Sequence, residues 1–141
     1  MFMDSNREKG TASVEFALIL PLLLLMLFLI IEFSIILYDK AVITNASREG
    51  ARSGIVFTGS QPPVSVGAIT ATVNTYCASN LISFGSSPPV TAVPSGACGG
   101  SGSLLTVNVS YTYDFFVLPK FISSATSGGI TLTGNTVMRC E

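Results

Sequence analysis

Three cysteines are the side chains of this chain best suited to do chemistry outside a membrane. They are Cys77, Cys98 and Cys140. The chain has no histidine, and its cysteines show no C-x-x-C spacing, so the residues give no support for a zinc site. In an oxidising compartment, one disulfide bond and one unpaired thiol are expected.

Three pairings of these cysteines are possible, and the spacing leaves the choice open. A bond between Cys77 and Cys98 would close a loop rich in glycine, serine and proline and add roughly 3 kcal/mol by chain entropy. This pairing is slightly favoured. A bond between Cys98 and Cys140 is nearly as good, because antiparallel pairing of residues 104–113 with 130–138 would bring residue 140 back to residues 98–103.

The amount and the placement of charge narrow the classes of function. Only 11% of the 141 residues are charged and the net charge is −1, whereas soluble domains carry about 25% charged residues. Seven basic residues without a cluster argue against nucleic-acid binding. No nucleophile–base pair, metal cluster or phosphate-binding loop is recognisable, so no catalytic residue, metal or cofactor is expected. The long stretch from Ser53 to Tyr113 has no charged residue, which suits a secreted or assembled part.

An apolar run near the N-terminus is long enough to cross a membrane. Residues 16–31 contain no charge, and the run continues to Tyr38 if Glu32 and Ser34 are included. At about 1.5 Å per residue, such a helix crosses a hydrocarbon core of ~30 Å. A cleaved secretory signal would have a shorter run and a small-x-small cleavage site. The run therefore predicts a membrane span that ends at Asp39 and Lys40.

Glu15 lies at the start of this run, and a charged residue at that position calls for an explanation. A carboxylate at membrane depth is costly unless it is paired, which favours a functional role. The alternative is that the side chain reaches toward the lipid head groups. The helical pattern itself has no sharp stop before Gly59 and the prolines at 62 and 63, so a helix is expected from Thr11 to about Val56. Its second half would present an apolar stripe to a small domain.

The remaining sequence predicts a small α+β domain. Apolar residues at helical spacing indicate a short helix over residues 65–81, and residues 83–103 form a loop by composition. Alternation predicts strands at 104–113 and 130–138, with a further short strand near residues 89–94. Residues 115–119 are either a strand end or an exposed apolar lip. The expected fold is a long N-terminal transmembrane helix extending into a distal domain with one short helix and a curled antiparallel sheet.

The N-terminal residues resemble a known family. A polar leader ends in Gly10 and is followed by Thr11-Ala12-Ser13-Val14-Glu15-Phe16 and a leucine-rich span, as in precursors of type IV pilins. The later stretch Asn45-Ala46-Ser47-Arg48-Glu49-Gly50-Ala51-Arg52 is similar to the TadE-like pseudopilins, or minor pilins, of the tight-adherence (Flp-type) pilus system. Counted from Thr11, Glu15 stands at the fifth position that such pilins occupy with glutamate.

The resemblance implies processing and assembly. A prepilin peptidase would cut between Gly10 and Thr11, and Gly10 can hold the extended backbone that a protease needs. Glu15 and Phe16 would take part in assembly, with the Glu15 carboxylate paired to the Thr11 amine of a neighbouring subunit. The expected division is a leader at 1–10, a transmembrane and juxtamembrane helix at 11–57 and a distal domain at 58–141.

Partners and location follow from the same resemblance. The partners would be the peptidase, pilin and pseudopilin subunits, the inner-membrane assembly platform and membrane lipid, with no nucleic acid. The N-terminus would be cytoplasmic and the distal domain periplasmic in a bacterial inner membrane, with incorporation into an extracellular pilus as an option. The distribution of basic residues does not itself favour that orientation. The alternative is an uncleaved, single-span anchor whose distal domain binds a ligand or surface.

Arg48, Glu49, Gly50 and Arg52 form a second candidate site. The two arginines are spaced i,i+4, so these residues could be a solvated face beside the membrane. Alternatively, Gly50 allows the helix to pack closely on the distal domain or on a partner. Both interpretations remain open from the sequence.

Overall fold

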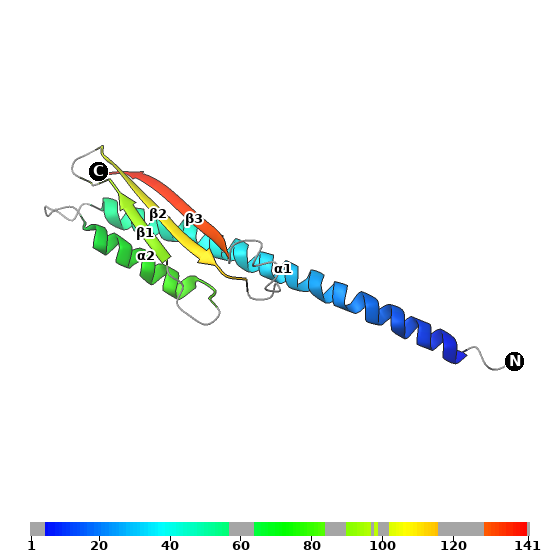
Figure 1. Ribbon diagram of the computed structural model, residues 1–141. Helices are drawn as coiled ribbons and strands as arrows, with labels where there is room; N and C mark the ends of the chain where they lie inside the picture. The colour runs from blue at the N-terminus through cyan, green and yellow to red at the C-terminus, as the bar shows by residue number, and fades with distance from the viewer. Residues whose placement is uncertain are drawn as a thin grey trace.

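The described part of the chain forms two helices and three strands. The computed structural model describes residues 5–56, 64–83, 90–96, 98, 102–115 and 129–140, with side chains from Gly10 onward. The elements are α1 (Ser5–Ile55), α2 (Val66–Asn80), β1 (Val90–Ser95), β2 (Leu104–Tyr113) and β3 (Ile130–Arg139). Figure 1 shows α1 projecting far beyond the other elements, with the N-terminus at its distant end. The expected α+β fold with a long N-terminal helix is confirmed.

α1 has a bare part and a packed part. Its 51 residues extend for about 77 Å, and Pro21 lies inside it without ending it. Side chains of residues 11–31 are exposed, and we refer to this stretch as the bare segment. From Glu32 onward one side of α1 is buried against the rest of the chain. We refer to residues 32–55 together with α2 and the sheet as the head.

Two details of α1 differ from expectation. The helix begins at Ser5 instead of Thr11, so it passes through Gly10 without a break. The apolar run to Tyr38 overlaps the head, because Glu32 is already buried. The bare segment alone is about 32 Å long, which is close to the ~30 Å of a hydrocarbon core.

The short helix α2 forms where the periodicity predicts it. The side chain of Ser65 caps the helix by accepting a hydrogen bond from the Ala68 amide at 3.2 Å. At the other end the Leu81 amide donates to the carbonyl oxygen of Cys77. The buried side chains Ile69, Val73 and Cys77 occupy one face, which packs on α1 and the sheet.

The sheet has three antiparallel strands in the order β1-β2-β3. Both long strands and the short third strand are confirmed, and β1 occupies part of the stretch expected to be a loop. Residues alternate along β2, with Leu105, Val107 and Val109 buried and the intervening polar side chains more exposed. This alternation places both helices on one face of the sheet.

The prediction that the sheet is curled is wrong. The strands are paired in continuous register, and β2 and β3 run along the straight axis of α1 (Figure 1). Gly134 of β3 lies against the backbone of α1, where an added Cβ atom would be 2.7 Å from the carbonyl oxygen of Ile43. A sheet held this closely along a straight helix has no room to curl toward it. Of the expected apolar lip, residues 116–119 lie outside the described residues, whereas Phe115 is half-buried and packs edge-on against Tyr113.

Candidate functional site: the long N-terminal helix and its contact with the head

The residues of the expected cleavage and assembly site all lie exposed at the start of α1. They are Gly10, Thr11, Glu15 and Phe16. Gly10 is helical, and a Cβ atom added there would meet nothing within 4 Å. The extended backbone expected at Gly10 is therefore absent from this conformation. A protease would have to unwind the helix locally, which glycine eases because it is about 1 kcal/mol less favourable than alanine in a helix.

Glu15 is separated from the head by most of the bare segment. It is the one charged residue among residues 11–31. The head begins at Glu32, about 26 Å farther along the helix axis. No side chain of the head can pair with Glu15 across that distance, so a partner from the head of the same chain is excluded.

The second candidate site divides between two sides of α1. Arg48, Glu49 and Arg52 are exposed, whereas Gly50 is buried. A Cβ atom added at Gly50 would lie 2.5 Å from Cγ2 of Val73 on α2. Gly50 thus lies directly against α2, whereas the three charged side chains are exposed to solvent.

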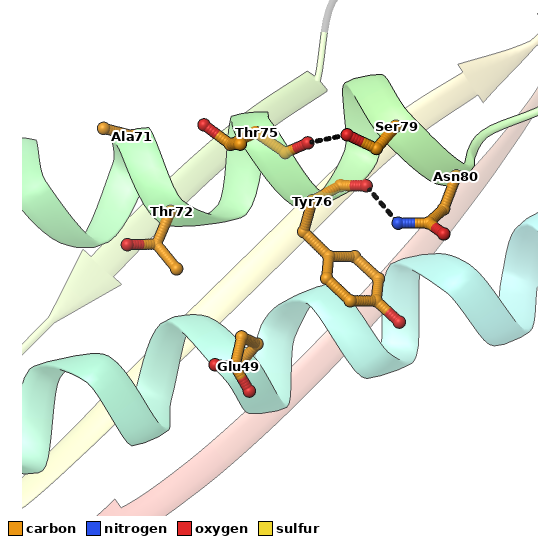
Figure 2. Close-up of a pocket in the computed structure, with 7 residues that line it drawn as sticks. All are labelled: Glu49, Ala71, Thr72, Thr75, Tyr76, Ser79 and Asn80. Carbon is orange, nitrogen blue, oxygen red and sulfur yellow. Dashed lines mark hydrogen bonds between the residues drawn. The ribbon is translucent and has the colours of Figure 1, made fainter.

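Glu49 borders a groove between α1 and α2. The groove has a volume of about 530 Å³ and is lined by Glu49, Ala71, Thr72, Thr75, Tyr76, Ser79 and Asn80. Figure 2 shows the Tyr76 ring pointing from α2 toward α1. Three donors of the groove bond within α2: Ser79 to the Thr75 carbonyl oxygen, Asn80 to that of Tyr76, and Thr72 to that of Ala68. Three polar side chains of the groove are therefore already bonded within α2, and a single carboxylate lies at its rim.

Substitution of Gly50 by alanine is expected to destabilise the head. Alanine is favoured over glycine in a helix by about 1 kcal/mol, but overpacking a core costs typically 1–3 kcal/mol, and the stiff Val73 side chain cannot move aside easily. The matched control is Gly67→Ala in the first turn of α2, where the nearest atom, Ser65 Oγ, lies 3.9 Å away. Thermal unfolding in detergent should show a lower Tm for Gly50→Ala and an equal or higher Tm for Gly67→Ala. Equal effects of the two substitutions would contradict the close packing.

Two buried acids join α1 to β2 and to the segment that follows α2, and neither of them was identified from the sequence. Glu32 is 2% exposed and accepts a hydrogen bond from the Tyr113 hydroxyl at 2.6 Å. Asp39 is fully buried and accepts a hydrogen bond from the Ile82 amide at 3.1 Å. The available signal was their spacing of seven residues, which continues to the buried Ala46 and marks one face of the helix.

The two oxygens of Asp39 have different surroundings. Oδ1 faces the Ile82 amide, whereas Oδ2 is buried with no hydrogen-bond partner among the described residues. Burial raises the pKa of the Asp39 carboxyl, and the Ile82 hydrogen bond opposes that effect. Burial is the main cause of the raised pKa values of Tyr111 and Tyr113 on β2. The hydrogen bond to Glu32 and the charge of Glu32 raise the pKa of Tyr113 further, and the Asp39 charge contributes to both.

The stability of the head should therefore fall as pH rises past the ordinary titration range of Asp39. A carboxyl whose pKa is raised in the folded state binds its proton more tightly there, so folding is favoured below that pKa and disfavoured above it. Each unit of difference in pKa is worth about 1.4 kcal/mol. Asp39→Asn keeps an oxygen for the Ile82 amide and removes the titration. When the pH is lowered from 7 to 4.5, the Tm of the wild type should rise relative to that of Asp39→Asn. If the Tm values of the two proteins change with pH in parallel, the proposed titration of buried Asp39 is contradicted.

The disulfide bond joins Cys98 to Cys140, with their Cα atoms 5.5 Å apart. The slight preference for Cys77 with Cys98 is wrong. Cys77 is a free, buried thiol on the core face of α2, and its burial raises its pKa. Backbone hydrogen bonds between Cys140 and the pair Gly102 and Ser103 hold the end of β3 beside the start of β2, which brings Cys140 to Cys98.

Together, these features define a class: a protein with one long apolar helix that carries a small α+β head. Within the described residues, Gly10–Ile55 is the helix long and apolar enough to cross a membrane, and it is consistent with a single span. Residues 10–52 match the family model of the TadE-like proteins, so the resemblance of this segment to that family is confirmed. No curated protein and no solved structure matches the chain.

Proposed function

We propose that the chain is a pseudopilin or minor pilin of the TadE-like type. A prepilin peptidase would remove the leader after Gly10, and the mature subunit would take part in assembly of Flp/Tad-type pili that mediate adhesion. The family match over residues 10–52 supports this proposal, because it covers both Gly10 and the Asn45 to Arg52 stretch. The protein would act through assembly and contact, without catalysis.

The observation that carries the proposal is the isolation of Glu15. Its carboxylate is exposed on an otherwise uncharged segment, and the head of its own chain begins about 26 Å away. A lone carboxylate at membrane depth is costly, and pairing relieves that cost. Cleavage after Gly10 would create a positively charged amine on Thr11, four residues away in sequence. The Thr11 amine of a neighbouring subunit would then be a suitable partner for Glu15.

The head supports a location outside the cytoplasm. Disulfide bonds persist in oxidising compartments such as the periplasm, and Cys98 is bonded to Cys140. We propose that the chain spans the bacterial inner membrane once with its N-terminus in the cytoplasm. In this arrangement the peptide bond after Gly10 would lie at the cytoplasmic surface, and the head would be available to pilin subunits and the assembly platform.

A Gly10→Val substitution tests the processing step. The chain is expressed with and without a prepilin peptidase, and its length is followed by gel electrophoresis and intact mass. The wild-type chain should lose residues 1–10 only when the peptidase is present, whereas Gly10→Val should stay full length. The control is Ala17→Val, which introduces the same side chain at an exposed position of the same helix and should be processed. Processing of Gly10→Val at the wild-type site would contradict the role of the glycine.

One observation favours a second candidate, the uncleaved membrane-anchored binding protein. α1 runs through Gly10 to Ser5 without a break, so the bond after Gly10 is not presented in an extended form. In that case, the wild-type chain would keep its leader in the presence of the peptidase. The experiment above separates the two candidates.

A further inference from the structure

The exposed face of α1 stays apolar beyond the level at which the head begins. Phe33, Leu37 and Tyr38 are 61%, 54% and 47% exposed, on the side of the helix that the head leaves uncovered. Over the same turns Glu32 and Asp39 are buried against the head. Residues 32–38 therefore have one side in contact with the head and another side that is apolar and uncovered.

The end of the sheet adds an apolar side chain at the same level. The hydrogen bond from Tyr113 to Glu32 fixes the end of β2 beside this part of α1. Ile130 pairs with Tyr113 in register at the start of β3 and is 38% exposed. Figure 1 shows these strand ends at the side of the head from which the bare part of α1 emerges. We name Phe33, Leu37, Tyr38 and Ile130 the base of the head.

We propose that the base of the head lies in the interfacial layer of a phospholipid bilayer, so that the head rests on the membrane surface. This inference rests on the proposed membrane anchoring. The bare segment fills the hydrocarbon core with about 32 Å, so the next seven residues, about 10 Å, enter the layer of head groups. Aromatic side chains such as Tyr38 are favoured in that layer because one end of the ring is polar.

Exposed charged residues near the base of the head limit how deeply it can enter the bilayer. Asp114 follows Tyr113 and is exposed, and Lys40 is exposed two residues after Tyr38. Charged groups are tolerated among hydrated head groups and are costly in hydrocarbon. The base therefore belongs at the interface and does not enter the core of the bilayer.

A bilayer explains the two-sided arrangement better than a second copy of the chain. Phe33 and Leu37 lie on the outer side of α1, whereas Ile130 lies on the side of the head, next to Tyr113. One protein partner seated on the outer face of α1 would leave Ile130 uncovered. A lipid surface surrounds the helix and reaches both sides at the same level.

The chain contains no tryptophan, so the fluorescence of a single introduced tryptophan reports on its own position. Leu37→Trp and Ile130→Trp probe the base, Leu24→Trp probes the bare segment, and Val137→Trp probes the far end of β3. All four positions are exposed, so the fold should tolerate the larger ring. Each full-length variant is reconstituted into phosphatidylcholine–phosphatidylglycerol vesicles with or without lipids brominated near the top of the acyl chains.

Leu37→Trp and Ile130→Trp should lose most of their fluorescence in brominated vesicles, whereas Val137→Trp should keep it. Quenching of Leu24→Trp by lipids brominated deeper in the chains shows that the anchor is inserted. If Leu24→Trp is quenched and both base variants are not, the inference is wrong while anchoring stands. If Leu37→Trp is unquenched with blue-shifted emission, another chain covers it, which also overturns the inference. If Leu24→Trp is not quenched, the membrane anchoring itself fails.

Discussion

Replacement of Glu15 by leucine is expected to abolish incorporation of the chain into pili while its insertion into the membrane is retained. Leucine makes insertion easier, because an acidic residue within a span is less favourable than leucine, by roughly 3 kcal/mol at the centre and by less near the end of the span, where Glu15 lies. The head cannot be affected directly, since it begins about 26 Å away along α1. The expected loss therefore concerns the contact that we propose between the Glu15 carboxylate and a neighbouring chain.

Two further substitutions separate charge from shape. Glu15→Gln keeps the size of the side chain and its ability to form hydrogen bonds but cannot form an ion pair, so it should assemble poorly. Val14→Leu alters the neighbouring exposed position without changing charge and should assemble normally. Each variant is expressed in a strain that lacks the wild-type chain. The fraction of piliated cells is counted, and the amount of variant protein in the membrane is measured. Normal piliation with Glu15→Leu would contradict the assembly role.

Loss of the disulfide bond is expected to have the largest effect on stability. The bond between Cys98 and Cys140 closes a loop with a sequence separation of 42 residues. The chain-entropy estimate for such a loop is about 4 kcal/mol. A loss of that size would lower the Tm by an amount on the order of 10–20 °C. Cys140 lies at the end of β3, so its release should also loosen the far end of the sheet.

The measurement compares unfolding of the wild-type protein in detergent with and without a reducing agent. A double variant with serine at positions 98 and 140 should match the reduced wild type. The control is Cys77→Ala, which removes a buried sulfur but should stay sensitive to reduction, because its disulfide bond is intact. Equal wild-type stability in both conditions, or a non-reduced peptide that links Cys77 to Cys98, would contradict this arrangement.

Local patterns predicted the secondary structure well. Alternation along residues 104–113 identified β2, and apolar residues at helical spacing identified α2. These signals are local, because each depends on which side chains of one element face the core. The beginning of α1 was misplaced since a polar leader with glycine continues a helix that is already formed from Thr11 onward.

Features that depend on distant contacts were not predictable in the same way. The cysteine pairing depends on how β3 returns beside the start of β2, and spacing alone left it open. The flatness of the sheet depends on how closely Gly134 approaches α1. Glu32 was expected within the span because nothing local shows that Tyr113, far along the sequence, supplies its hydrogen bond.

The candidate site was predicted more by resemblance than by physics. Gly10, Thr11 and Glu15 are exposed residues far from the head, so the roles proposed for them depend on partners. For Gly50 the structure adds a local reason, which is its contact with Val73. Arg48 and Arg52 are exposed to solvent, and a contact with lipid or with a partner remains a prediction for them.

Cleavage by a prepilin peptidase is the step on which the proposed function depends, and the N-terminal residue of the purified protein shows whether it has occurred. The chain is purified from the membranes of cells that carry the peptidase and, in parallel, from cells that lack it, and each sample is sequenced from its N-terminus. We expect the chain from the first cells to begin at Thr11 and the chain from the second to retain residues 1–10. Retention of residues 1–10 in both samples would show that the peptidase does not process the chain.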